Sequence, residues 1–257
     1  MRQIASLLII GLVLVRCGDL ERNNPFDPKN PNATIAQTIA VELFVNDSTG
    51  FEFCSYATGA IEELAQETIY RDKICVLEYH LMNRVSGWND IYAMEEFNQR
   101  YYEYVPNSSE RAIPDAMFNG LTKRVQGASF ENIKQRYVDA LGTLLGRTSP
   151  FGLQGIKKIS NNGFELDLRL AMYGNGAKEN LRLIAVIYED LNMKGHRFLV
   201  RQILPVQTIP HIQHGEIKSF RFSAPLPRYE NATSLYAVVL VQDSQSSKKE
   251  ILQAASF

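Results

Sequence analysis

The stretch from Val41 to Leu64 constrains the fold most, because it predicts a buried strand, a short loop and a helix in direct succession. The apolar-periodic helix begins at Cys54. Unpaired N–H groups and the positive end of the helix dipole favour a thiolate there, so Cys54 is a candidate nucleophile. Dithiol chemistry needs a second cysteine three residues away, but Phe51 and Ala57 occupy those positions. The sequence therefore predicts the helix start of a dithiol site with only one thiol.

The composition describes an ordinary globular protein. The chain has 257 residues, 45% of them hydrophobic and 21% charged, which is enough for one large domain or two ordinary ones. There are 27 Lys and Arg residues against 28 Asp and Glu residues. This balance gives no electrostatic reason to expect nucleic acid as a partner. Three cysteines are too few for a disulfide scaffold.

The N-terminus has the pattern of an export signal. Residues 4–15 form an apolar run with the length of a signal-peptide core, whereas a membrane-spanning helix needs about 20 residues. Cys17 follows this run directly, and LeuValArgCys resembles the lipobox of bacterial lipoproteins. The resemblance implies that residues 1–16 are a signal peptide and that a lipid on Cys17 makes the membrane a partner. The alternatives are an ordinary secretory signal with a chance cysteine, or an uncleaved anchor.

Residues 17–40 are predicted to be a lipid-anchored linker. They contain LERNNPFDPKNPN, in which prolines disfavour a helix and apolar periodicity is weak. Linkers of this kind resemble those of envelope lipoproteins. Because Gly18 stands where an inner-membrane lipoprotein would have aspartate, the resemblance implies the outer membrane of a bacterial cell envelope.

Periodicity predicts an α/β region over residues 41–146. The expected order is strand, helix, strand, helix, two strands and helix, which is the order of the thioredoxin fold. The strands are expected at 41–46, 73–81, 115–119 and 122–127, and the helices at 55–69, 91–104 and 129–146.

Specific segments of this region resemble the Omp28-related outer-membrane lipoproteins, a family with a thioredoxin-like domain. The matching segments are CSYATGAIEEL at 54–64, GluTyrHis at 78–80, ArgTyrTyr at 100–102 and IleProAsp at 113–115. One register makes Cys54 the second cysteine of Cys-x-x-Cys, and the other makes it the first. The resemblance implies a cis peptide bond before Pro114, which would shape the site beside the thiol. The expected site-lining residues are Phe51, Phe53, Tyr56, Ala57 and Ile113.

Residues 150–257 are predicted to be a β-sandwich domain. Period-two alternation appears in several runs, with turns between them, which suggests an immunoglobulin-like sandwich. The runs are 164–172, 181–189, 197–204, 216–223, 235–242 and 249–255.

Other groups give weaker signals. His211 and His214 could offer metal nitrogens, but no third ligand is evident and surface histidines are the better interpretation, so we expect no metal site and no cofactor. The i,i+4 pair Glu96 and Arg100 is expected on a solvated helix face. Glu62 and Glu63 are also expected at the surface. Cys75 should remain unlinked to Cys54, because a helix of about 22 Å separates them.

Two functional hypotheses follow. In the first, the chain is an exported, lipid-anchored protein that has lost dithiol chemistry and acts in binding or envelope organisation, with an envelope protein as a possible partner. In the second, Cys54 acts as a monothiol oxidoreductase that forms mixed disulfides.

Overall fold

The computed structural model describes residues 27–30, 32–48, 51–82, 90–127, 130–160, 163–226 and 229–257. The signal peptide expected at 1–16 and the expected lipidation site Cys17 lie outside these residues. Within them, no helix is both long and apolar enough to cross a membrane.

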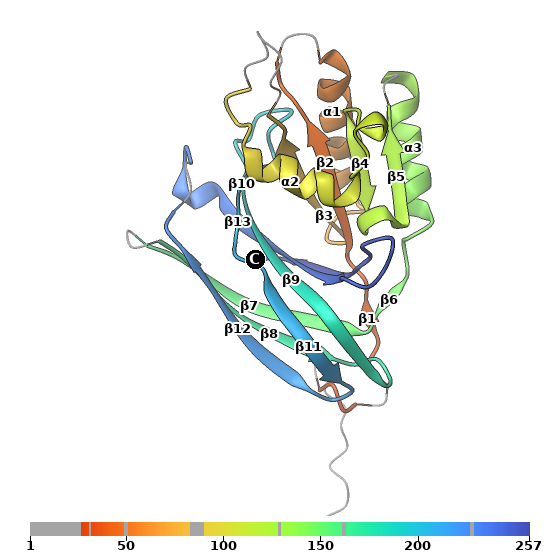
Figure 1. The fold of residues 1–257 in the computed structure, drawn as a ribbon, viewed down its shortest axis with the longest axis vertical. Coiled ribbons are helices and arrows are strands. Elements are labelled where there is room, and N and C mark those ends of the chain that lie inside the picture. The colour runs from red at the N-terminus through yellow and green to blue at the C-terminus, as the bar shows by residue number, and fades with distance from the viewer. Residues whose placement is uncertain are drawn as a thin grey trace, which may run out of the picture.

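A nine-stranded sheet forms the centre of the molecule (Figure 1). Its strand order is β14-β13-β9-β10-β3-β2-β4-β5, and β11 also pairs with β9. β2 and β3 are parallel, whereas β4 and β5 continue the sheet in antiparallel fashion. The strands are β2 (Ile39–Val45), β3 (Ile74–His80), β4 (Asp115–Phe118), β5 (Lys123–Gln126), β9 (Ala177–Glu189), β10 (Leu199–Ile203), β11 (Gln207–Gln213), β13 (Leu235–Asp243) and β14 (Ile251–Ser256).

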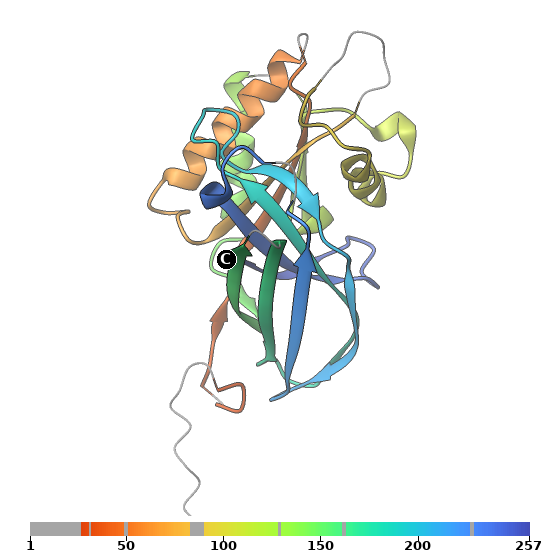
Figure 2. The same cartoon turned by 90° about the vertical axis from the view of Figure 1, so that its left-hand side faces the viewer.

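Three helices cover the part of this sheet that contains β2 to β5. α1 (Glu52–Gln66) and α3 (Phe130–Gly142) lie on one face, and α2 (Glu95–Tyr104) lies on the other (Figures 1 and 2). α1 forms because Cys54, Ala57, Ile61 and Leu64 recur at helical spacing and are all buried against the sheet. Short 3-10 helices occur at Ser108–Glu110, Gly120–Thr122 and Ala232–Ser234.

A second, three-stranded sheet packs against the other part of the large sheet. Its order is β12-β8-β7, formed by Ile217–Ala224, Gly163–Met172 and Phe151–Ser160. β9 contributes side chains to the apolar cores on both faces of the large sheet, because its alternate side chains point to opposite faces. Leu183 and Ala185 pack toward the small sheet, whereas Ile184 and Val186 belong to the core under α2.

The end of the expected linker belongs to the folded body. β1 (Ile35–Ala36) pairs with β6 (Thr148–Ser149), and β2 already begins at Ile39. Gln37 Nε2 also donates to the carbonyl oxygens of Ile251 and Leu252, each at 3.1 Å. Residues 35–40 therefore do not act as a free tether.

The expected thioredoxin-like α/β domain followed by an immunoglobulin-like sandwich is wrong. The order of helices and strands through residue 142 agrees with the periodicity. However, the described chain is mostly β, with fourteen strands and three short α-helices, and no separate α/β unit is evident among the described residues. β10 pairs in parallel with β3, so one sheet continues across the boundary that we expected near residue 150. Periodicity reports local structure, but it does not say which strands pair.

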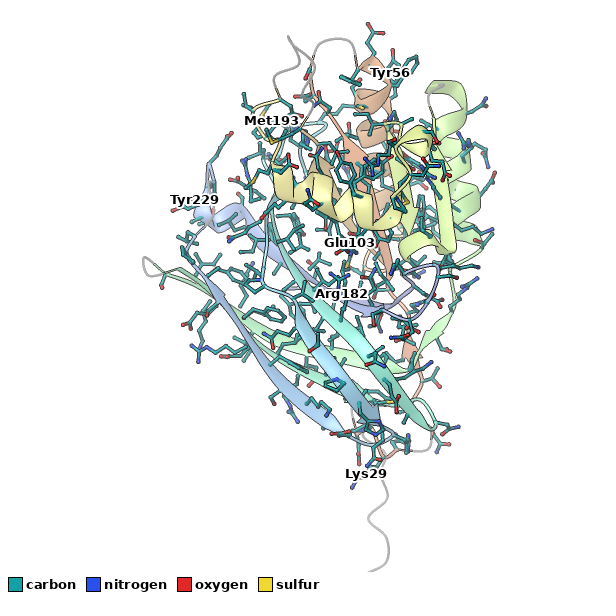
Figure 3. All side chains as sticks on the ribbon, in the orientation of Figure 1. Lys29, Tyr56, Glu103, Arg182, Met193 and Tyr229 are labelled. Carbon is teal, nitrogen blue, oxygen red and sulfur yellow. The ribbon has the colours of Figure 1, made fainter. Side chains whose placement is uncertain are left out.

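A buried ionic network joins α2 to the sheet and corrects the expected solvated pair of Glu96 and Arg100. Arg100 is only 4% exposed and donates to both carboxylate oxygens of Glu42, at 2.9 Å each. Its Nη1 also donates to Glu103 at 2.9 Å. Glu103 in turn accepts two hydrogen bonds from Arg182 of β9 at 3.0 Å (Figure 3). The network therefore links strands from both halves of the sequence.

Candidate functional site

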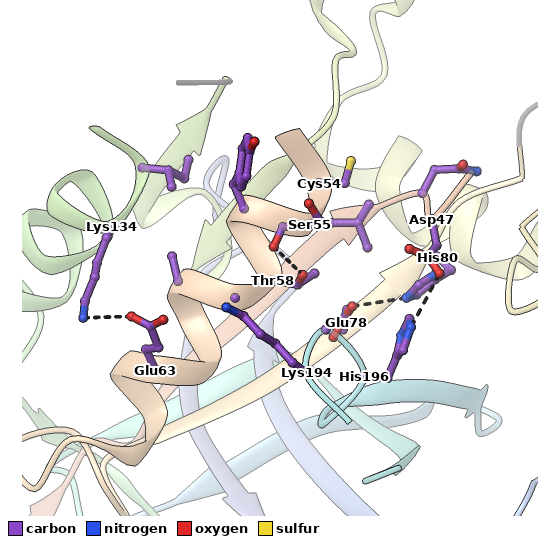
Figure 4. Close-up of a pocket in the computed structure, with 17 residues that line it drawn as sticks. Asp47, Cys54, Ser55, Thr58, Glu63, Glu78, His80, Lys134, Lys194 and His196 are labelled. Atoms are coloured by element: carbon purple, nitrogen blue, oxygen red, sulfur yellow. Dashed lines mark hydrogen bonds and ion pairs between the residues drawn. The ribbon is translucent and has the colours of Figure 1, made fainter. Parts of the chain in front are cut away.

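A cavity of about 590 Å³ opens beside the N-terminal half of α1 (Figure 4). Its walls come from α1, the carboxyl ends of β2 and β3, α3, and the loop between β9 and β10. β2 and β3 are parallel with Val45 opposite His80, so the residues that follow both strands meet at the same edge of the sheet. This edge is where a mixed or parallel sheet commonly places its functional groups.

Cys54 lines the cavity, but its side chain is almost fully buried and does not have the exposure of a nucleophile. It sits in the first turn of α1, is 3% exposed and packs in the apolar core under this helix. Burial raises the pKa of the Cys54 thiol to about 12, and the nearby Asp47 carboxylate acts in the same direction. The thiol is therefore protonated at neutral pH, which is the opposite of an activated cysteine.

The other predicted site residues are divided between the core and the surface. Tyr56 lines the cavity, whereas Phe53 is 48% exposed and Ala57 is fully buried. Phe51 and Ile113 are partly buried against the same core as Cys54.

Pro114 is buried, and the Ile113–Pro114 bond is cis, as expected. Cys75 is a free, buried thiol in the core on the other face of the sheet, so the expected lack of a disulfide with Cys54 is confirmed.

Ionisable residues gather at the floor of the cavity. Glu78 and His80 point to the α1 face of β3, and His80 Nε2 lies 3.2 Å from Glu78 Oε1. His80 Nδ1 lies 2.7 Å from Asp90 Oδ2. Asp90 is fixed by backbone N–H groups of Asp47 and Tyr92, at 2.7 and 2.9 Å. His80 is therefore oriented from both sides.

The charges of this cluster depend on one another. Burial raises the pKa of Glu78 to about 7. Burial alone would lower the pKa of His80, but its hydrogen bonds to Asp90 and Glu78 raise it to about 9. Although burial would raise the pKa of Asp90, the hydrogen bond with His80 lowers it below the ordinary value. Buried groups with such shifted values are typical of functional sites.

His196 completes the cluster from the loop between β9 and β10. Its Nε2 lies 3.5 Å from Asp47 Oδ2, and its buried Nδ1 has no hydrogen-bond partner among the described residues. Its ring lies against Tyr92 and His80, with centroid distances of 5.1 and 5.7 Å. Burial lowers the pKa of His196, so this imidazole is neutral at neutral pH.

Glu62 holds the loop that carries His196. We expected Glu62 at the surface, but it is 3% exposed, whereas Glu63 is exposed as expected. The two carboxylate oxygens of Glu62 accept the backbone N–H groups of Gly195 and Arg197, both at 2.9 Å. The residues on both sides of His196 are therefore fixed to α1.

The sequence did not identify Glu78, His80 and His196 as one group. Glu78 and His80 were noted only as a matching segment at a strand end, and His196 gave no signal. The histidines that we did consider, His211 and His214, are exposed on and after β11, as expected for surface residues.

Comparisons with known proteins identify a shared fold. No family model matches the sequence, and no curated protein matches it. The structure is similar to that of HBP35 of Porphyromonas gingivalis, with a TM-score of 0.63 over 87% of this chain and 75% of that chain, at 13% identity.

Two further solved structures match only in part. A β-glucuronidase from glycoside hydrolase family 2 has a TM-score of 0.29 and 11% identity, and the match covers 41% of this chain and 10% of that chain. Alkylpurine DNA glycosylase AlkC of Pseudomonas fluorescens has a TM-score of 0.30 and 12% identity, and the match covers 48% of this chain and 33% of that chain. These two are too dissimilar to bear on this chain. The likeness to HBP35 shows that this chain shares its fold with a bacterial protein.

Proposed function

We propose that this chain is an exported, lipid-anchored protein of the bacterial cell envelope that binds a ligand in the cavity beside α1. The observation that carries the proposal is the cavity itself, with oriented ionisable groups at its floor and a buried, protonated thiol in its wall. Cavities of this size with a few convergent polar groups are the usual form of a small-ligand site. The predicted export signal, the predicted lipidation of Cys17 and the resemblance to Omp28-related lipoproteins support the envelope as its location.

The position of the cavity suits an anchored binding protein. Figure 3 labels Lys29, close to the first described residue, at one end of the molecule and Tyr56, at the cavity, near the other end. A lipid on Cys17 would hold the Lys29 end toward a membrane. The cavity would then face away from that membrane, where a soluble ligand can reach it.

Binding explains Cys54 better than monothiol catalysis. A thiol that is almost fully buried and protonated at neutral pH can neither reach nor attack a disulfide. Cys54 is therefore a small apolar residue in the cavity wall.

Native-state alkylation across pH tests this assignment. In the full chain with Cys75→Ala, Cys54 should resist alkylation under native conditions up to strongly alkaline pH and should react fully after unfolding. Peptide mass spectrometry separates Cys54 from Cys17. A native Cys54 that reacts with an apparent pKa below about 8.5 would support the oxidoreductase and overturn the proposal.

Binding itself can be tested at the cavity mouth. Ser55 and Glu52 are both exposed in the first turn of α1, but only Ser55 lines the cavity. In NMR screens with a small-molecule fragment library, Ser55→Trp should abolish most binding, whereas Glu52→Trp should leave it intact. Fragments that bind both variants equally well would show that the cavity is not the binding site.

A further inference from the structure

Three potential metal ligands converge at the cavity floor from two distant parts of the sequence. Glu78 and His80 are two residues apart on β3, so their side chains leave the same face of the strand. The backbone N–H of Glu78 donates to the carbonyl oxygen of Phe198 at 2.9 Å, which brings His196 beside them. One ligand atom from each of Glu78, His80 and His196 lies within 4.8 Å of the other two.

The surroundings of these side chains are unusual for a central strand. The preceding residue on the same face of β3, Val76, belongs to the apolar core under α1. Glu78 and His80 follow on this face and are each only 1% exposed. Buried ionisable groups are found paired or bound to a metal ion. Glu78 and His80 are paired here, and buried ionisable clusters of this kind beside a cavity are typical of functional sites.

His80 has the geometry of a metal-binding histidine whose second ring nitrogen is hydrogen-bonded to a carboxylate. Nδ1 is held by Asp90 at 2.7 Å, which leaves Nε2 directed to Glu78 Oε1 at 3.2 Å. Two atoms that each lie about 2.0 to 2.1 Å from one zinc ion at tetrahedral angles are about 3.3 Å apart. A carboxylate on the other ring nitrogen is the usual means by which proteins orient a histidine ligand.

His196 provides the third donor. Its Nε2 faces the carboxylate of Asp47 at 3.5 Å, and its Nδ1 is buried without a partner among the described residues. A buried nitrogen without a hydrogen bond is costly, and coordination would remove that cost. His196 thus has one nitrogen beside a carboxylate and one without a partner, whereas an ion bound to His80 would take the place of the contact between its Nε2 and Glu78.

We propose that Glu78, His80 and His196 bind a divalent transition-metal ion, with Zn²⁺ as the preferred ion. Two imidazoles and one carboxylate form a donor set that Zn²⁺ uses when a fourth position stays open. Ca²⁺ and Mg²⁺ prefer oxygen ligands alone. All three residues line the cavity, so a ligand in the cavity could occupy the fourth position of the ion. This inference rests on the proposed binding function and names the ion through which the ligand would be held.

Zn²⁺ titration of the full chain tests the site. After treatment with a chelator, isothermal titration at neutral pH in a buffer that does not bind metal should give one Zn²⁺ per chain. His196→Gln and Glu78→Gln should each weaken binding by more than the roughly 10- to 100-fold that the loss of an outer hydrogen-bond partner costs, because each removes a direct ligand. Co²⁺ in place of Zn²⁺ should give the visible absorption of a tetrahedral or five-coordinate site, which both variants should lose.

His211→Gln is the matched control, because His211 is an exposed histidine that lies 3.6 Å from Glu179. It should bind Zn²⁺ as the wild type does. Circular dichroism and urea unfolding without metal identify any variant that fails to fold. Wild-type protein that binds no Zn²⁺ at micromolar concentration, or folded His196→Gln protein that binds as tightly as the wild type, would overturn the inference.

These outcomes are separable from those of the proposed function. Fragments that bind at the cavity without Zn²⁺ binding would preserve the function and reject the metal site. Zn²⁺ binding with a reactive Cys54 would preserve the metal site and reject the assignment of Cys54.

Discussion

The replacement of Glu62 by glutamine tests how the cavity floor is positioned. In the wild type, both carboxylate oxygens of Glu62 accept backbone N–H groups of the loop that carries His196. Glutamine offers one oxygen, and its NH₂ group would face the N–H of Gly195 or Arg197. The substitution therefore removes one charge-assisted hydrogen bond and leaves a buried donor without an acceptor.

The expected loss of stability is the difference between two opposing effects, the hydrogen bonds that Glu62 makes and the cost of burying its charge. A hydrogen bond to a charged group contributes about 1.5 to 3 kcal/mol. Burial raises the pKa of Glu62, so the carboxylate also has a desolvation cost that glutamine avoids. We expect a net loss of about 1 to 2 kcal/mol in the free energy of unfolding.

Glu63→Gln provides the control at the adjacent position. Glu63 is exposed and forms an ion pair with Lys134 at 3.2 Å, so its replacement should cost less than about 1 kcal/mol. Urea unfolding followed by far-UV circular dichroism measures both variants. Zn²⁺ titration adds a second readout, because Glu62→Gln should also weaken binding through His196. Equal stability of the two variants would refute the role that we give to Glu62.

The ionic network under α2 gives two more predictions. Arg100→Met should lower the free energy of unfolding by about 3 to 5 kcal/mol, because it leaves the buried Glu42 carboxylate uncompensated, and adding Glu42→Gln should recover much of this loss in urea unfolding. A loss below about 1 kcal/mol would contradict this account. Although burial would raise the pKa of Glu103, its hydrogen bonds with Arg182 and Arg100 lower it. The Glu103 carboxylate therefore stabilises the folded state at pH values above the ordinary pKa of a glutamate, by under about 1 kcal/mol because it is partly exposed. This stabilisation is lost as the pH falls through the lowered pKa of Glu103. Thermal unfolding of Glu103→Gln should consequently differ from wild type at neutral pH but not in strong acid, and a difference that persists in strong acid would contradict it.

The strands that periodicity missed have physical reasons for their weak signals. β7 contains Gly152 and Gly155, which disfavour a strand prediction. A Cβ at these positions would lie 2.8 Å from the Tyr173 ring and 2.9 Å from the Phe257 ring, so a larger residue would force these rings to shift. β11 contains Pro210, which also argues against a strand. Among the described strands, however, β11 pairs with β9 alone, and proline is acceptable in such an edge strand.

The fold class could not be predicted because it depends on long-range pairing. The periodicity of β9 indicates a strand, but both of its faces are apolar, and the sequence does not show what covers each face. A strand in a sandwich and a strand in the centre of a long sheet would look the same. The pairing of Leu199 with Glu78, which joins the two halves, leaves no local pattern at all.

The cavity floor was partly predictable from the strand that carries Glu78 and His80. The segment at 73–81 was predicted as a strand, and alternation places Val76, Glu78 and His80 on one face. A central strand that is apolar at its start and ionisable at its carboxyl end indicates a site, since buried ionisable groups cluster at functional sites. The position of His196 could not be found in this way, because it lies in a loop 118 residues after Glu78 by their numbers (196 − 78 = 118). The strand therefore predicts where the site lies, and only the tertiary structure shows which donor completes it.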